Sequence, residues 1–305
     1  MCRGPQPERT QYISASFTLR AQTAGMRIAN LDGRLVLMGP DGALDVERAS
    51  AGRFTSDPQA VYGRWDEFVD WVASAPDGPL TAVDEDRLGS PSPRPGQVFA
   101  IGLNYSEHAA ESGFEVPDAD PPVFTKFPAC ITGARGDVRL PPGGNTDWEV
   151  ELVAVIGRRA FQVGRQQAWS HVAGLSVGQD LSERRSQMAG PSPQFSLAKS
   201  FPRFGPVGPW LVTLDEVADP DNLAIGATIN GETVQQSRTN ELIFDVPTII
   251  EKLSAVVPLA PGDIVFTGTP AGVGMGRTPP RWLAAGDELV SYVEGIGELR
   301  HRFVA

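Results

Sequence analysis

Two glutamates in the segment DWEVEL, Glu149 and Glu151, are spaced so that they could share a cation. In a strand, residues i and i+2 point to the same face, which would place the two carboxylates side by side. Like charges at that distance repel each other, and burial strengthens the repulsion. Asp180 ends a separate apolar stretch, and three converging carboxylates form a hard oxygen site that suits Mg²⁺, Mn²⁺ or Ca²⁺ better than zinc. On spacing alone, solvated acids on an edge strand are the simpler interpretation of the glutamate pair.

A histidine and a glutamate in the segment NYSEHAAESG could form a catalytic pair. His108 and Glu111 are three residues apart, so on a helix they lie on one face. A carboxylate beside an imidazole orients the ring and supports a general base that takes a proton from water. The same spacing is also typical of a surface contact between neighbouring turns. The other two histidines, His171 and His301, have no comparable neighbourhood and are assigned structural roles.

Two further segments could stabilise an anion. Lys199 lies among apolar and turn residues, where it could hold a carboxylate or enolate oxygen, although an exposed lysine is the ordinary alternative. The segment TGTPAGVGMG, residues 267–276, offers backbone N–H groups and two threonine hydroxyls to an anionic oxygen. It is not a phosphate-binding loop, because no Gly-Lys-Ser/Thr follows, and it does not open a dinucleotide-binding βαβ unit.

The elements that must position these residues are mostly predicted strands joined by tight turns, which favours a β-rich α+β fold. Turns are predicted at Asp32-Gly33, Asp41-Gly42 and Asn230-Gly231. Strands are predicted over 98–105, 149–157, 172–182 and 262–270, short strands over 26–48, a hairpin over 224–235, and helices over 64–75, 106–113 and 246–259.

The chain is expected to divide into a small and a large domain. The segment GSPSPRPGQ, residues 89–97, is rich in Pro, Ser and Gly and is typical of a linker. We therefore predict a small N-terminal domain over 26–92 and a main domain over 96–305. Residues 1–25 lack the apolar core of a signal peptide and are interpreted as a poorly ordered extension.

Composition excludes several classes of partner. The net charge is −11 and the pI about 4.8, which argues against nucleic acid and anionic membranes. We find no apolar run of about 18 residues, so a transmembrane helix is not predicted. Two cysteines far apart in sequence make a disulfide framework improbable and favour a reducing cytoplasm.

The order of six segments resembles the fumarylacetoacetate hydrolase family over residues 96–305. The segments are GLNYSEHAAESG, PPVFTKFP, DWEVELVAVIG, GQDLSERRSQ, LAKSFPRFGPVGPW and PGDIVFTGTPAGVG. The resemblance implies a mixed β-roll with short helices, assembly as a homodimer, and the small leading domain of longer bacterial members. Where many relatives carry Ala-Arg-Asp, this chain has Glu183-Arg184-Arg185, which could alter pocket charge or loop pairing.

The resemblance also assigns roles by position. It implies that Glu149, Glu151 and Asp180 bind Mg²⁺ or Mn²⁺, with Ca²⁺ as an occupant in crystals. It implies that His108 and Glu111 form the catalytic pair on a lid helix, with Lys199 near the metal. The implied substrate-site residues are Lys126, Arg184, Gln187, Thr269 and Tyr105, the last also expected to support the lid.

Several functions remain open at this stage. The leading hypothesis is metal-assisted hydrolysis of a carbon–carbon bond in a small β-diketo acid, such as an acylpyruvate, through a metal-stabilised enolate. The same machinery could decarboxylate oxaloacetate-type acids, or isomerise or hydrate unsaturated oxo acids. A silent homologue with a structural cation needs no base, so His108 and Glu111 argue against it. Nothing specific favours a protein-interaction module.

Overall fold

The structure is a computed structural model that describes residues 26–76, 78–111, 117 and 119–305. The predicted N-terminal extension, residues 1–25, lies outside the described residues. The described chain is rich in strands with short helices, as the sequence predicts. None of the described helices is long and apolar enough to cross a membrane.

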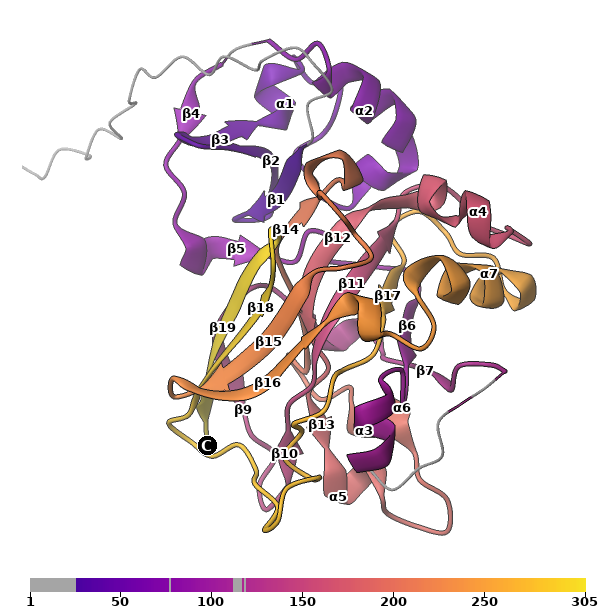
Figure 1. The fold of residues 1–305 in the computed structure, drawn as a ribbon. Helices are drawn as coiled ribbons and strands as arrows, with labels where there is room; N and C mark the ends of the chain where they lie inside the picture. Colours follow the sequence, from indigo (N-terminus) through magenta and orange to yellow (C-terminus); the bar gives the residue numbers. More distant parts are fainter. Residues whose placement is uncertain (1–25, 77, 112–116, 118) are drawn as a thin grey trace, which may run out of the picture.

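Most strands belong to one large mixed sheet and a second, smaller sheet that is antiparallel except for the parallel pair β19–β9 (Figure 1). The path of the large sheet runs β4-β3-β2-β1-β14-β12-β11-β17-β6-β7, with β5 paired to β1 and β8 to β14. Its strands are β1 Arg27–Leu31, β2 Arg34–Gly39, β3 Gly42–Asp45, β4 Leu80–Thr81, β5 Leu88–Gly89, β6 Val98–Ile101, β7 Val123–Thr125, β8 Ile131–Thr132, β11 Val150–Ile156, β12 Val172–Gln179, β14 Gly205–Val212 and β17 Ile264–Phe266.

The second sheet has the order β16-β15-β18-β19-β9, and a small ribbon pairs β10 with β13. These strands are β9 Arg135–Arg139, β10 Thr146–Asp147, β13 Ser182–Glu183, β15 Ala224–Ile229, β16 Glu232–Arg238, β18 Glu288–Val293 and β19 Gly297–Val304. The α-helices are α1 Val46–Ala49, α2 Trp65–Val72, α3 Ser106–Glu111, α4 Arg165–Ala168, α5 Arg184–Gln187, α6 Phe195–Ala198 and α7 Val246–Val256.

The central strand β11 is buried along its whole length, and its side chains belong to two different hydrophobic cores. Leu152 and Ala154 belong to the core shared with the second sheet, whereas Val153 and Val155 belong to the core shared with α2. This division follows from the alternation of side chains along a strand. Glu151 has the same parity as Val153, so its carboxylate lies on the α2 side of the sheet.

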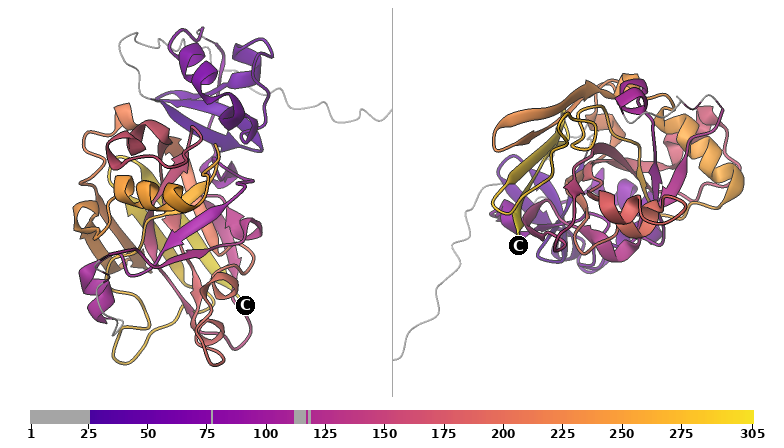
Figure 2. Two further views of the ribbon diagram at one scale, coloured as in Figure 1. Left: turned by 90° about the vertical axis from the view of Figure 1, so that its right-hand side faces the viewer. Right: turned by 90° about the horizontal axis from the view of Figure 1, so that it is seen from below.

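The N-terminal strands extend the large sheet and lie at one end of the molecule (Figures 1 and 2). Strand β1 pairs with β14, so residues 27–31 are joined by hydrogen bonds to the main region. The segment predicted as a linker is packed: Ser92 Oγ donates to the carbonyl of Gly262, and Tyr62 Oη donates to the carbonyl of Pro91. A division of the chain between residues 92 and 96 stays a prediction.

Local signals fix most element boundaries. Asp32 and Gly33 both have positive φ, 53° and 77°, and join β1 to β2 in the tight turn that the sequence predicts. Helix α7 begins where Asp245 caps it, because the carboxylate accepts the N–H of Thr248. Strand β6 ends at Ile101, earlier than the predicted 105, because Leu103 adopts a φ of 53° that leaves the extended conformation.

Candidate metal and catalytic site

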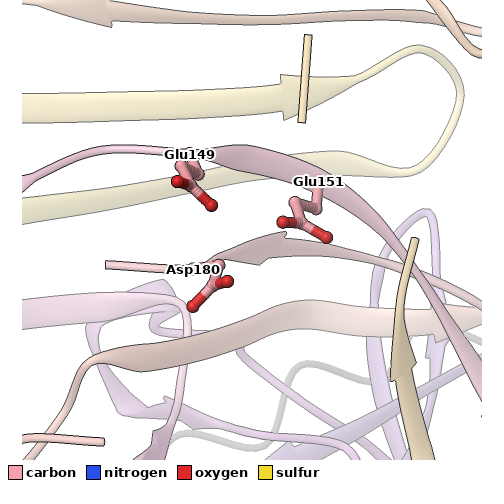
Figure 3. Close-up of side chains that lie close together, drawn as sticks. All are labelled: Glu149, Glu151 and Asp180. Atoms are coloured by element: carbon pink, nitrogen blue, oxygen red, sulfur yellow. The ribbon is translucent and has the colours of Figure 1, made fainter. Parts of the chain in front are cut away.

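The three predicted metal-binding carboxylates meet where β11 and β12 pair. Val150 of β11 is opposite Gln179 of β12, which places Glu149 just before one strand and Asp180 just after the other. The N–H of Asp180 donates to the carbonyl of Glu149 at 2.9 Å. One oxygen from each of Glu149, Glu151 and Asp180 lies within 4.8 Å of the others, and all three side chains are buried. Figure 3 shows the carboxylates turned toward a common space.

Three buried cations surround this cluster. Lys199 Nζ lies 2.6 Å from Glu149 Oε2 and 2.7 Å from Asp180 Oδ2. Lys126 Nζ lies 2.7 Å from Asp180 Oδ1, and Arg184 Nη2 lies 2.6 Å from Glu149 Oε1. Burial would raise the pKa of Glu149, but Lys199 and Arg184 lower it, so this carboxylate is charged. Burial opposes the charge on Lys199, yet Asp180 and Glu149 raise its pKa and keep the ammonium group protonated.

Glu151 differs from its neighbours because no described lysine or arginine forms an ion pair with it. Its Oε2 accepts the N–H of Gly268 at 2.6 Å. Burial, together with the charges of Asp180 and Glu149, raises the pKa of Glu151 well above its usual range. A divalent cation among the three carboxylates would supply the missing positive charge, and an all-oxygen donor set suits Mg²⁺ or Mn²⁺. The residues present therefore fit a metal of this kind.

The predicted catalytic pair faces the same place from α3. His108 is buried, and its Nδ1 lies 3.5 Å from Glu111 Oε2, beyond the range of a well-aligned hydrogen bond. Within the described residues His108 Nδ1 has no other hydrogen-bond partner. Glu111 also accepts the N–H of Gly272, at 3.0 Å to Oε2. Burial would raise the pKa of Glu111, but His108 and the Gly272 N–H lower it, so the carboxylate is charged beside the ring.

Asp147 is a site residue that the sequence analysis did not single out. It is fully buried, and its Oδ2 accepts Arg184 Nε at 2.8 Å while its Oδ1 accepts the N–H of Gly274 at 2.6 Å. A Cβ at Gly274 would lie 2.0 Å from the carbonyl of Arg281, so only glycine fits this approach. Asp147 thus joins Arg184 to the loop 272–275. The signal was present, because acids at 147, 149 and 151 share one strand parity.

The predicted substrate-site residues separate into two groups. Arg184 and Gln187 line a pocket with His108, Glu149 and Lys199, and Arg184 Nη1 donates to Gln187 Oε1 at 2.8 Å. Lys126 is not among the residues that line this pocket. Its ammonium group contacts the carboxylate of Asp180 and also donates to the carbonyl of Lys199.

Thr269 and Tyr105 are not among the residues that line this pocket. The Thr269 hydroxyl accepts from Gln235 and donates to the carbonyl of Val150, both in buried contacts. Tyr105 is buried, and its carbonyl accepts the N–H of Ala109 in α3, which fits support of the helix. Direct substrate contacts from Lys126, Thr269 and Tyr105 stay predictions.

The unusual Arg185 turns away from the pocket. Its guanidinium donates to the carbonyl of Gly143, and its side chain is exposed. Glu183 instead caps α5, accepting the N–H groups of Arg185 and Ser186. Of the two effects that the sequence suggested, the structure shows loop pairing.

Comparison with known proteins places the chain among relatives of one family. The family model for the fumarylacetoacetate (FAA) hydrolase C-terminal region matches residues 97–304. The mitochondrial oxaloacetate tautomerase FAHD2A of Bos taurus is 42% identical over 227 residues, which cover 74% of this chain and 72% of the relative.

Two solved structures illustrate the range of similarity. A "putative HpcE protein" from Mycobacterium smegmatis is 56% identical, with a TM-score of 0.88 over 92% of this chain and 99% of that one. Maleylpyruvate hydrolase from Sphingobium sp. SYK-6, in complex with manganese(II) and pyruvate, is 27% identical, with a TM-score of 0.71 over 92% and 99%.

Proposed function

This chain belongs to the fumarylacetoacetate hydrolase family, and from that premise we propose that it hydrolyses a carbon–carbon bond in a small β-diketo acid of the acylpyruvate type. The observation that carries the proposal is the position of His108, with Glu111 beside it, in the same pocket as Glu149 and Lys199. A structural cation would need the carboxylates but no buried histidine facing them. The homodimer and the cytoplasmic location remain predictions.

The proposed reaction is balanced by one water molecule. The water oxygen forms a bond to the distal carbonyl carbon of R–CO–CH₂–CO–COO⁻, and the bond between that carbon and the CH₂ group breaks. The products are R–COO⁻, one proton and pyruvate, because the released enolate takes a proton on carbon. A divalent ion held by Glu149, Glu151 and Asp180 would supply Lewis-acid stabilisation of the enolate oxygen.

The residues of the chain divide the remaining work. His108 takes the proton from water, and the charged Glu111 carboxylate favours the imidazolium that results. Lys199, kept protonated by Asp180 and Glu149, places a positive charge beside the developing negative charge. Arg184 is held by Asp147 and Glu149, which fixes its direction at the edge of the pocket.

A second candidate is isomerisation of an oxo acid, favoured by the similarity to a mammalian oxaloacetate tautomerase. Such a reaction needs proton transfer at the carbon next to the carbonyl and no attack by water. The same histidine could carry that proton, so the residues of the site alone are compatible with both reactions.

Product analysis separates the two candidates. We would incubate the Mn²⁺-loaded protein with 2,4-dioxopentanoate and with oxaloacetate, each in H₂¹⁸O, and follow the products by mass spectrometry. Hydrolysis predicts pyruvate and ¹⁸O-labelled acetate in equal amounts. An isomerase would accelerate enol–keto exchange of oxaloacetate and leave the carbon skeleton intact. Absence of acetate at every protein concentration would overturn the hydrolase proposal.

A further inference from the structure

The pocket beside the carboxylate cluster has one apolar side that the proposed chemistry does not use. We define the apolar wall as Leu103, Phe124, Met188, Phe195 and Met275, which line the same pocket as the charged residues. Phe124 and Phe195 meet edge to face, with ring centroids 5.4 Å apart. Lys199 Nζ lies 5.0 Å from the centroid of Phe124, so the wall begins next to the charged site.

The apolar wall is partly open to solvent, which is costly unless something covers it. Met188 is 50% exposed, and Phe124, Phe195, Leu103 and Met275 are partly exposed. Each apolar group that a ligand covers here contributes favourably to binding, at about 25 cal/mol per Å² of apolar surface. A substrate tail of hydrocarbon would gain this contribution, whereas a charged tail would lose hydration instead.

The cations that line the pocket are already paired with carboxylates of the protein. Lys199 contacts Glu149 and Asp180, and Arg184 contacts Asp147 and Glu149. Because these contacts are buried ion pairs, drawing either cation toward a second substrate carboxylate would weaken an ion pair that is already made. A dicarboxylate tail would therefore face protein cations that are neutralised.

The sequence of the segments that supply the apolar wall adds no further cation. Residues 102–124, 186–198 and 267–276 contain neither lysine nor arginine. The next basic residue along the chain, Arg277, donates to the carbonyls of Val234 and Gly272 and lies over the ring of Trp148. Among the residues that line the pocket, a distal carboxylate would therefore meet no lysine or arginine other than Lys199 and Arg184.

We infer that the substrate is a 2,4-dioxo acid whose acyl tail is uncharged and apolar, an alkyl or aryl group packed on the apolar wall, and not a dicarboxylate. This inference rests on the proposed function for the reaction, but its chemical basis is the wall. It predicts discrimination by the far end of the substrate, while the 2-oxo acid end is common to both classes.

A substrate series tests the inference directly. We would measure kcat/KM of the Mn²⁺-loaded protein for 2,4-dioxopentanoate, 2,4-dioxoheptanoate, 4-phenyl-2,4-dioxobutanoate and the dicarboxylate 2,4-dioxohexanedioate. We expect kcat/KM to rise about threefold to fourfold for each added methylene, as burial of a CH₂ group predicts. We expect the dicarboxylate to fall at least tenfold below 2,4-dioxoheptanoate. Equal or faster turnover of the dicarboxylate would overturn the inference.

Variants of the wall test its role against a matched control on the same helix. Phe195→Ala should abolish the gain between the five- and seven-carbon acids, whereas Leu197→Ala, at a side chain 73% exposed outside the pocket, should retain it. Met188→Arg places a cation at the pocket mouth and should raise kcat/KM for the dicarboxylate while lowering it for the phenyl compound. The inference fails if Phe195→Ala and Leu197→Ala behave alike with both substrates.

A binding measurement keeps the inference separate from the reaction. Calorimetry with 2-oxohexanoate and 2-oxoglutarate, which cannot undergo the cleavage, compares an apolar with a carboxylate tail. Tighter binding of 2-oxohexanoate without any turnover of dioxo acids would support the apolar site and overturn the hydrolase proposal. Tighter binding of 2-oxoglutarate would overturn the inference whatever the reaction.

Discussion

Glu149 of the carboxylate cluster and His108 of the His108–Glu111 pair line one pocket, but the two groups of residues are held in different ways. The cluster sits at the ends of β11 and β12, strands that are buried at every residue and paired along their length. The pair sits on the six-residue helix α3, whose described contact to the neighbouring loop is made by Glu111 with the N–H of Gly272.

Because of this difference, we expect metal binding and substrate turnover to depend on different residues. Residues fixed by a central sheet keep their geometry without ligand, so the cluster can hold an ion before substrate arrives. A short helix has little stability of its own, since its few backbone hydrogen bonds do not repay nucleation. Substitutions in the cluster should therefore change metal binding and stability, and substitutions on α3 should change mainly kcat.

The largest effect is expected from Glu151→Gln, which removes the carboxylate without an ion-pair partner. Activity should fall by about a thousandfold or more, because one of three metal ligands is lost. In EDTA the free energy of unfolding of the variant should exceed that of the wild type by about 1 kcal/mol or more. The raised pKa of Glu151 means that this carboxyl group must take up a proton to fold without metal, and glutamine carries no such cost. Urea unfolding with and without metal measures both effects.

Added metal provides the control for that prediction. At a concentration one hundred times its Kd, Mn²⁺ should stabilise the wild type by about 2.7 kcal/mol and the variant much less. Equal stabilisation of both proteins by Mn²⁺ would show that Glu151 is not a ligand and would break the proposed contrast between the two regions.

His108→Ala should reduce kcat by about a hundredfold to ten-thousandfold, the range for loss of a general base. Its affinity for Mn²⁺, measured by electron paramagnetic resonance, should stay within a few fold of the wild type. His171→Ala, at a partly exposed ring that contacts the carbonyl of Arg159, is the matched control and should leave kcat unchanged. Wild-type activity in His108→Ala would show that His108 is not the general base.

Asp147→Asn addresses the connection between the two regions. Both partners of Asp147, Arg184 Nε and the N–H of Gly274, are hydrogen-bond donors. The NH₂ group of an asparagine is also a donor, so it cannot replace a carboxylate oxygen as acceptor and one of the two contacts must break. We expect kcat/KM to fall about tenfold to a hundredfold with little change in metal affinity. Asp263→Asn, an equally buried carboxylate bonded to Gln97 and Ala260, should destabilise the fold without this loss of activity. An equal fall in kcat/KM for the two variants would show that Asp147 has no specific role in positioning Arg184.

The smallest effect on turnover is expected for His301→Gln, which contrasts a structural histidine with His108. His301 is buried against the carbonyl of Gly133, and burial lowers its pKa to about 3. The folded state therefore favours the neutral ring, so its contribution to stability is complete above about pH 6.5 and is lost as the pH falls toward 3.

The measurement is urea unfolding of both proteins across that pH range. Between about pH 6.5 and 3, the wild type should lose up to about 1.4 kcal/mol per pH unit more than His301→Gln. The activity of the variant at neutral pH should equal that of the wild type. Parallel pH profiles would show that His301 is as accessible to protons in the folded state as in the unfolded state.

Much of the fold could be predicted because its signals are local. The turn at Asn230-Gly231, where both residues have positive φ, and the cap of α7 at Asp245 depend on residues within four positions of each other. The apolar run of β11 indicates a strand with no solvent-facing side. The pairing of β1 with β14 could not be predicted, because alternation fixes the faces of a strand but not its distant partner.

The sequence by itself identified most of the candidate site residues and determined which of them share a strand face or a helix face. Only the tertiary structure decided that Asp147 holds Arg184, that Lys126 lies behind Asp180, and that Glu151 alone of the three carboxylates has no described ion-pair partner. The physical reason is range: backbone geometry sets positions a few residues apart, whereas ion pairs between segments depend on how the sheet brings those segments together.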